Sequence, residues 1–283
     1  MPEEAVKEAV SSEWFERAVR FGHAAKAAVF GVIGVMAARL ALGDRDETPD
    51  FVGAMESMAN RPLDVLFLGV LSLGLFAYAG WRIAVALLNL HDRKNGVSGL
   101  LSRGTMFAAG VTYAFFGVYA IALLAGMRRD DESIDDETAT VMSWPFGEWI
   151  VGAVAVGFVA AGAREVFVAF TGRYRDEFRN VRLHTAEKWL VHASGWWGHA
   201  ARGAIYIVAG VYGVRAAWNY DADEAKGFAE ALGEIGSGPW GVWLLLFIAA
   251  GLAAFGAYSL LLAIHRHVPD ADGTDGPREE RLP

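Results

Sequence analysis

Three cations recur at one position of a repeated motif and are the first candidates for chemistry. Each follows a glycine by four residues and precedes an aromatic residue by four, a spacing that aligns the side chains along one helix face. The three sets are Gly22, Lys26 and Phe30; Gly99, Arg103 and Phe107; and Gly198, Arg202 and Tyr206. If the copies surround an axis, the cations could bind a small anion or the phosphate of an anionic lipid. The alternative, favoured on general grounds, is that each cation anchors its own helix at the membrane interface.

A second matched pair of cations, Arg39 and Arg215, lies thirteen residues after the first cation of its copy. In a helix this separation is about 20 Å, so the pair belongs near the opposite membrane interface. We predict that the two arginines pair with carboxylates of the adjacent loops, such as Asp44 or Asp221. An anion-attracting site outside the membrane is the alternative.

Histidines and cysteines limit the possible cofactors. His23 and His199 share one repeat position, which is the minimal arrangement for axial ligation of a haem, but the middle copy has Leu100 there. We therefore predict interfacial histidines, no cofactor and no metal. The chain has no cysteine, which excludes disulfides, thiolate catalysis and iron–sulfur ligation. It also shows no nucleophile elbow, no phosphate loop and no paired carboxylates at glycosidase-like positions, so an enzyme is the weaker class.

Carboxylates are scarce within the apolar segments. Glu165 lies near the end of its segment, whereas Asp64 and Glu148 lie in the first turn of theirs, where a helix N-terminus favours negative charge. Coupled transporters usually have an acidic or broken-helix site near the middle of the bilayer. The sequence shows no such site, which disfavours a coupled transporter and leaves an uncoupled channel open.

Six apolar segments must position these residues. Hydrophobic residues make up 54% of the 283 positions, and each segment is close to or above the ~20 residues that cross a bilayer as a helix. The segments are roughly 22–42, 63–89, 104–126, 146–170, 198–218 and 240–264. We predict an all-α polytopic membrane protein with six transmembrane helices, whose two termini lie on the same side.

The loop charges predict the orientation of the six helices. The three loops at 43–61, 127–143 and 219–237 hold five cations and sixteen carboxylates. The segments at 1–20, 91–103, 171–195 and 266–283 together hold fourteen cations. Because cytoplasmic loops are rich in Lys and Arg, we expect a multi-pass protein of the cell membrane with both termini in the cytoplasm. The basic side then faces anionic lipid, and we infer no nucleic-acid partner.

The second segment of each copy repeats with an even stricter register. A proline stands near its start, a glycine follows twelve residues later, and another small residue comes five residues after that. These sets are Pro62, Gly74 and Ala79; Pro145, Gly157 and Gly162; and Pro239, Gly251 and Gly256. The register predicts three tandem helix hairpins in a pseudo-threefold arrangement. We expect Gly74, Gly157, Gly251, Gly162 and Gly256 to allow close helix packing.

The repeats divide the chain into segments. We assign an interfacial amphipathic segment to 1–20, the first repeat to 21–92 and the second repeat to 97–173. An interfacial linker helix at 174–194, the third repeat at 196–267 and a disordered tail at 268–283 complete the division.

These repeats resemble a known family. The openings of the copies and the glycine-rich stretches Gly74-Leu75-Phe76-Ala77-Tyr78 and Gly251-Leu252-Ala253-Ala254-Phe255 are similar to the three-repeat, six-span family catalogued as domain of unknown function twelve-zero-six. The middle copy departs from the motif at Ser102, where the others have alanine, and the first copy departs at Ala27. The resemblance implies a six-span bundle and no established activity.

From the residues we favour a non-enzymatic membrane scaffold or accessory subunit that contacts anionic lipid. A small transporter or channel along the repeat axis is the alternative, and a haem-binding electron-transfer subunit is a weaker one. The expected partners are membrane lipid and either another membrane protein or a second copy of the chain.

Overall fold

A computed structural model describes residues 13–44, 49–57, 64–88, 96–126, 134–178, 181 and 183–265. Within these residues, all regular elements are helices. The proposed tail at 268–283 and most of the proposed N-terminal segment lie outside them. From Glu13 onward that segment continues without a break into the first long helix, α2.

Six long helices confirm the six apolar segments. They are α2 (Glu13–Ala41) and α4 (Asp64–Leu88) in the first copy, α5 (Val97–Leu124) and α7 (Gly147–Thr171) in the second, and α8 (Thr185–Asn219) and α10 (Gly241–His265) in the third. Five of them are long and apolar enough to cross a membrane, and α8 is the exception. The polar residues His199, Arg202 and Arg215 all lie on α8. The protein is thus an all-α, multi-pass membrane protein made of three helix-pair repeats.

Each acidic loop contains a short helix that the sequence pattern did not predict. These helices are α3 (Phe51–Ser57), α6 (Ile134–Met142) and α9 (Phe228–Gly236), and the third loop adds the 3-10 turn η2 (Ala222–Glu224). α3 packs on α2 and α5, and α9 packs on α8, α10 and α2. Phe51 of α3 stacks on Phe116 of α5, with ring centroids 4.5 Å apart. The loops therefore fold back over one end of the bundle, which we call the acidic end; the basic end is the opposite one.

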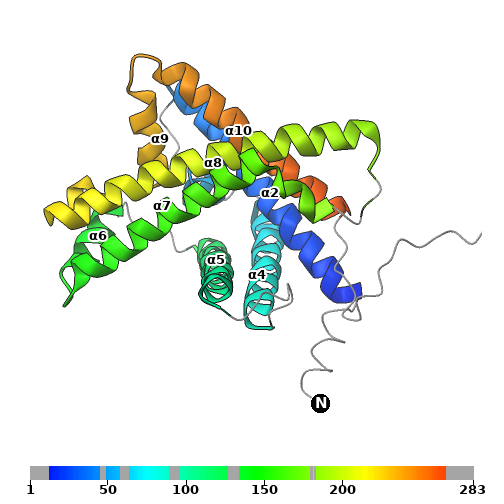
Figure 1. Cartoon of the computed structure of the whole chain (residues 1–283), viewed down its shortest axis with the longest axis horizontal. Coiled ribbons are helices and arrows are strands. Elements are labelled where there is room, and N and C mark those ends of the chain that lie inside the picture. Colours follow the sequence, from blue (N-terminus) through cyan, green and yellow to red (C-terminus); the bar gives the residue numbers. More distant parts are fainter. Residues whose placement is uncertain are drawn as a thin grey trace, which may run out of the picture.

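The helices pack in an interrupted ring. The second helix of each copy packs on the first helix of the next: α4 on α5, α7 on α8, and α10 on α2 (Figure 1). Helices of the same copy also pack together in the first copy (α2 with α4) and the third (α8 with α10). α5 and α7 form no comparable interface among the described residues. The pseudo-threefold order is therefore kept, but the ring is open within the second copy.

The first set of repeat glycines packs within a copy. A Cβ atom built on Gly74 would lie 2.5 Å from Ala25 Cβ, and one built on Gly251 would lie 2.5 Å from Ala201 Cβ. Ala25 and Ala201 occupy equivalent positions on α2 and α8. Copies one and three therefore use the same close approach between their two helices, as predicted for small residues in a membrane bundle.

The second set of glycines packs between copies. A Cβ on Gly162 of α7 would lie 2.7 Å from the carbonyl oxygen of Gly203 on α8. A Cβ on Gly256 of α10 would lie 2.9 Å from the carbonyl oxygen of Ala27 on α2. Gly203 and Ala27 are again equivalent positions, so this small residue makes the contact that joins the second copy to the third and the third to the first. At the equivalent Gly104 of the second copy, a Cβ would meet nothing within 4 Å.

Gly157 departs from the predicted packing role. It is exposed, and a Cβ built on it would meet nothing within 4 Å. The residue four positions later is Ala161, where copies one and three have the large buried rings of Tyr78 and Phe255. Because the second copy lacks this ring and its two helices do not pack together, its repeat glycine has no neighbour.

The segment proposed as a separate linker helix at 174–194 has a different structure. A 3-10 helix, η1 (Arg173–Phe178), is followed by α8, which runs unbroken from Thr185 through the predicted span 198–218. Outside that span, the backbone N–H of His184 donates to Glu187 Oε2 at 2.8 Å, and His265 Nε2 lies 3.2 Å from Glu187 Oε1. This carboxylate thus joins the start of α8 to the end of α10.

The contacts of Glu187 predict a pH-dependent stability difference. The hydrogen bond from His184, together with the neighbouring His265, holds the pKa of the Glu187 carboxyl below its usual range. The stabilisation is therefore present above the unfolded-state pKa of about 4.3 and is lost as the pH falls through the lower folded-state value. We expect Glu187→Gln to melt below the wild type at pH 6, with the gap closing near pH 3. A gap that stays constant in melting curves over this range would contradict the assignment.

Candidate functional site

Two of the three predicted cations, Lys26 and Arg202, meet at the centre of the bundle. Lys26 of α2 is 6% exposed and Arg202 of α8 is 8% exposed. Both lie against the ring of Phe255 on α10, with Lys26 Nζ 4.6 Å and Arg202 Cζ 4.1 Å from its centroid. Cations held over aromatic faces are stabilised by the ring quadrupole. Lys26 and Arg202 occupy the same repeat position in two different copies. Both therefore contact one side chain, that of Phe255.

The third cation, Arg103, does not join them. Its Nε donates to the carbonyl of Ala86 at 2.6 Å and its Nη2 to that of Leu87 at 3.1 Å. These carbonyls belong to the last turn of α4, where a cation satisfies groups that the helix leaves without a partner. The three cations therefore do not form a symmetric ring, and Arg103 stabilises a helix end.

Tyrosines surround Lys26. Its Nζ donates to Tyr78 Oη at 3.3 Å, and Arg82 Nη2 of the same helix as Tyr78 donates to that oxygen at 2.7 Å. Tyr113 of α5 packs edge-on against Tyr78, with centroids 4.6 Å apart. Arg82 is half-buried and interacts electrostatically with Glu177 of η1. Lys26 itself is therefore held by the hydroxyl of Tyr78 and by aromatic rings.

Arg202 has a carboxylate partner that the sequence did not reveal. Glu165 of α7 is 8% exposed. Its Oε2 lies 3.5 Å from Arg202 Nη1 and accepts from His199 Nδ1 at 2.5 Å. Arg202 Nη2 donates to Tyr206 Oη at 2.9 Å. We call Lys26, Arg202, Glu165 and His199 the central cluster.

A signal for Glu165 was present in the repeat. It stands eight residues after Gly157, at the position that holds Arg82 in the first copy and Ser259 in the third. The three second helices thus place a cation, a carboxylate and a hydroxyl at one repeat position. The place of Glu165 near the end of its predicted helix indicated instead a charge at the membrane interface.

The paired histidines are buried within the bundle, and their place at the membrane interface stays a prediction. His23 is 2% exposed and packs edge-on against Tyr78 at 5.1 Å between centroids. His199 packs in the same way against Phe255 at 5.3 Å. Because Tyr78 and Phe255 are also equivalent, the same histidine–aromatic contact recurs in copies one and three. Among the described residues, no cluster of three or more His, Asp and Glu side chains could hold a metal ion.

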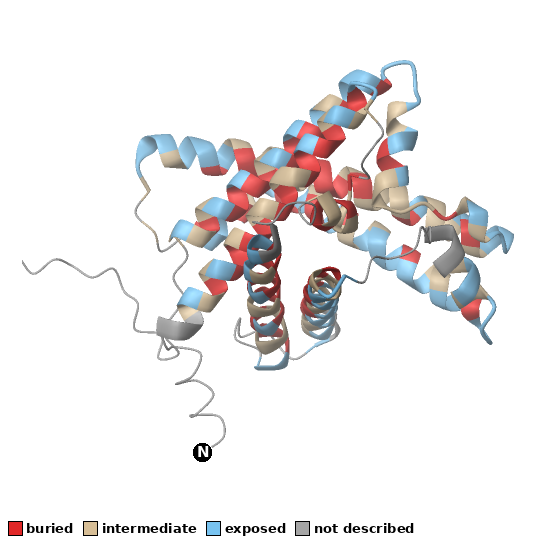
Figure 2. Cartoon of the chain, turned by 180° about the vertical axis from the view of Figure 1, so that it is seen from behind, coloured by how far each residue is buried: buried red, intermediate tan, exposed pale blue. Residues whose placement is uncertain are grey.

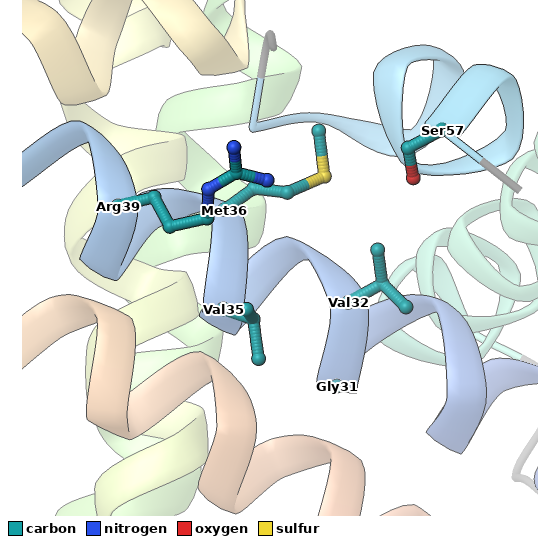
Figure 3. Close-up of a pocket in the computed structure, with 6 residues that line it drawn as sticks. All are labelled: Gly31, Val32, Val35, Met36, Arg39 and Ser57. Atoms are coloured by element: carbon teal, nitrogen blue, oxygen red, sulfur yellow. The ribbon is translucent and has the colours of Figure 1, made fainter. Parts of the chain in front are cut away.

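The outer cations pair with loop carboxylates, as predicted. Arg39 Nη2 lies 2.6 Å from Asp44 Oδ2, and Arg215 Nε lies 3.4 Å from Glu224 Oε2. A shallow pocket of about 280 Å³ lies beside Arg39 at the acidic end (Figure 3). Its lining residues are Gly31, Val32, Val35, Met36, Arg39 and Ser57. Apart from Arg39 and Ser57, its lining residues are apolar.

The centre of the bundle is filled by side chains. Phe30, Leu75, Leu252 and Phe255 are at most 1% exposed. Figure 2 shows the buried residues concentrated where α2, α8 and α10 meet. The middle of the bundle therefore packs like an interior, and the central cluster lies within it.

The central cluster carries more positive than negative charge. Among the described residues, the charged side chains of Asp, Glu, Lys and Arg classed as buried are Lys26, Arg202 and Glu165. The cluster thus holds two buried cations and one buried carboxylate, and the carboxylate faces Arg202. Uncompensated charge is costly in an apolar interior.

A bundle of long apolar helices in three hairpin repeats, with an unbalanced polar cluster inside it, defines a multi-pass integral membrane protein. The chain belongs to the family described as Domain of Unknown Function (DUF1206), whose model matches it three times, at residues 21–89, 105–172 and 197–266. Each match falls within one of the three copies, so the family resemblance is confirmed. The chain is similar to "Uncharacterized protein YxxB" of Bacillus subtilis (strain 168), with 27% identity over 256 residues, 90% of this chain and 92% of the relative. No solved structure matches the chain.

Proposed function

We propose that the protein is a non-enzymatic membrane scaffold or accessory subunit that binds the headgroup of an anionic lipid at Lys26 and Arg202. The observation that carries this proposal is the charge imbalance of the central cluster, which contains two buried cations and one buried carboxylate. An anionic phosphate group supplies the missing negative charge and accepts hydrogen bonds from both cations.

The position of the cluster supports a lipid rather than a solute from outside. Lys26 lies in the first half of α2, and Glu165 lies in the last two turns of α7, so both are nearer the basic end. By the excess of Lys and Arg in the linking segments, the basic end faces the cytoplasm. The cytoplasmic leaflet is the one that carries anionic headgroups.

A second candidate, a small transporter or channel, is favoured by one observation. Glu165, His199 and Arg202 form a hydrogen-bonded group of ionisable residues inside the bundle, and such groups mark ion pathways in membrane proteins. The filled centre counts against a conducting axis. Flux of small anions into liposomes that contain the protein would favour this candidate, and its absence would favour the scaffold.

The lipid proposal predicts different effects for two cations at one repeat position. Native mass spectrometry of protein released gently from its membrane should detect anionic lipid on the wild type. Lys26→Gln should lower the bound fraction about tenfold, because half of the buried positive charge is removed. Arg103→Gln is the matched control, since its guanidinium binds carbonyls at the end of α4. Equal loss in the two variants would favour simple anchoring and contradict the proposal.

A further inference from the structure

We propose that Glu165 is a tethered counterion, and that a phosphate-type oxyanion binds at Arg202 and His199 by displacing its carboxylate. This inference rests on the proposed function and names the residue that competes with the ligand. Glu165 Oε2 faces both Arg202 Nη1 and His199 Nδ1, at 3.5 and 2.5 Å. The carboxylate thus occupies the position that an external anion would take.

Glu165 satisfies only part of the hydrogen-bonding capacity of Arg202. A guanidinium binds a carboxylate best through two parallel hydrogen bonds, whereas here a single long contact joins Nη1 to Oε2. The Nε atom of Arg202 is buried and has no hydrogen-bond partner among the described residues. Arg202 is therefore a buried cation with an unused donor, although a carboxylate lies beside it.

The second donor residue is also incompletely satisfied. His199 Nδ1 donates to Glu165, since an ionised carboxylate can only accept, but His199 Nε2 is buried without a hydrogen-bond partner among the described residues. The His199 ring is fixed between Phe255 and Tyr258 of α10, each 5.3 Å away between centroids. The bundle thus fixes the donor groups of Arg202 and His199, and the carboxylate of Glu165 is the group that can move.

The chemistry of the site selects the ligand class. A phosphate group presents several oxygens, so it can accept from Arg202 Nη1 and Nε together, while Lys26, which lies against the same Phe255 ring, adds a second positive charge. A single carboxylate tethered to α7 does not make both contacts. The ligand is therefore a phosphate group with net negative charge, either on a lipid headgroup or as a soluble anion.

The helix that carries Glu165 is suited to releasing it. α7 packs on one long helix, α8, and has no comparable interface with α5, the other helix of its copy. Glu165 is joined on its own helix to Arg164, whose Nη1 lies 3.2 Å from Oε1 and whose side chain is 57% exposed. A displaced carboxylate can therefore stay paired with Arg164 at the open side of the ring.

Glu165→Gln tests the competition directly. The variant keeps the size and hydrogen-bonding capacity of the side chain and removes the competing charge, so we expect it to bind the anion about tenfold more tightly than the wild type. The probes are dihexanoyl phosphatidic acid and inorganic phosphate, each titrated by calorimetry into purified protein in phosphatidylcholine nanodiscs. Binding of the lipid alone identifies a headgroup as the source, and binding of both shows that free phosphate suffices. Glu148→Gln, the same change in the first turn of α7, should leave the affinity unchanged.

The outcomes separate this inference from the function on which it rests. If the wild type binds and Glu165→Gln binds equally or more weakly, the tethered counterion is wrong and the anion site stands. If neither protein binds either probe, both proposals fail. Binding by Glu165→Gln alone supports the competition by Glu165 and contradicts the proposed function, which requires the wild type to bind.

A measurement on the wild type covers the case in which Glu165→Gln does not fold. Dicyclohexylcarbodiimide modifies carboxyl groups inside membrane proteins, and mass spectrometry locates the modified residue. Saturating phosphatidic acid should increase modification of Glu165 at least threefold, because the carboxylate leaves Arg202 and His199. Unchanged or reduced modification would overturn the proposal.

Discussion

Replacing Arg202 by leucine is expected to lower the free energy of unfolding by about 3–5 kcal/mol, one of the two largest effects that the structure predicts. The variant leaves Glu165 buried with its main cationic partner removed. The hydroxyl of Tyr206 loses a donor as well. Melting curves in mild detergent, analysed with urea titrations where unfolding is reversible, measure the effect.

Two further variants separate charge burial from lost packing. Arg202→Leu combined with Glu165→Leu removes both charges and should recover more than half of the lost stability, because apolar side chains can replace a buried ion pair at little cost. Arg215→Leu is the matched control on the same helix. Its side chain is 57% exposed, so its pair with Glu224 should contribute less than about 1 kcal/mol. A loss for Arg202→Leu no greater than for this control would mean that water reaches the cluster.

The second large effect is expected at the contact between the last and first long helices. Gly256→Leu places a side chain against the backbone of α2, where even a Cβ would lie 2.9 Å from Ala27 O and 3.0 Å from Gly31 N. The backbones must separate, which we expect to cost about 1–3 kcal/mol or more and to broaden the melting transition. Size-exclusion chromatography and melting curves in detergent would detect both changes.

Gly157→Leu is the control for that experiment and also tests the interruption of the ring. A Cβ at Gly157 meets no neighbour within 4 Å, so the variant should melt at the wild-type temperature or slightly above, because leucine is the better helix former. Equal destabilisation by the two variants would mean that α7 packs against a further helix, either α5 or a helix of a second copy of the chain. That result would contradict the open ring.

Most of the fold could be predicted because its signals are long and repeated. Six apolar segments of membrane-spanning length leave few alternatives to a six-helix bundle, and the recurrence of Gly74 as Gly157 and Gly251 marks the copies. The short helices of the acidic loops escaped prediction, because helices of seven or nine residues carry little periodic signal. The open packing of the second copy was not predicted either, since it depends on Ala161, which is too small to replace Tyr78.

The candidate site was only partly accessible from the sequence. Lys26 and Arg202 could be paired through the repeat, but their meeting on Phe255 depends on the way in which α10 lies between α2 and α8. Arg103 has the same repeat position and a different role, because α5 lies beside the end of α4. Glu165 was judged by its depth along the helix, and depth says nothing about which face of the helix is buried.

The packing of α10 on α2 has a consequence for biosynthesis. α2 enters the membrane first and α10 enters last, yet Lys26 of α2 lies over the ring of Phe255, which α10 supplies. During translation the first hairpin, in which Lys26 already has Tyr78 as a partner, must therefore remain in the lipid before this lysine can contact Phe255. Synthesis of α10 then completes the surroundings of Lys26.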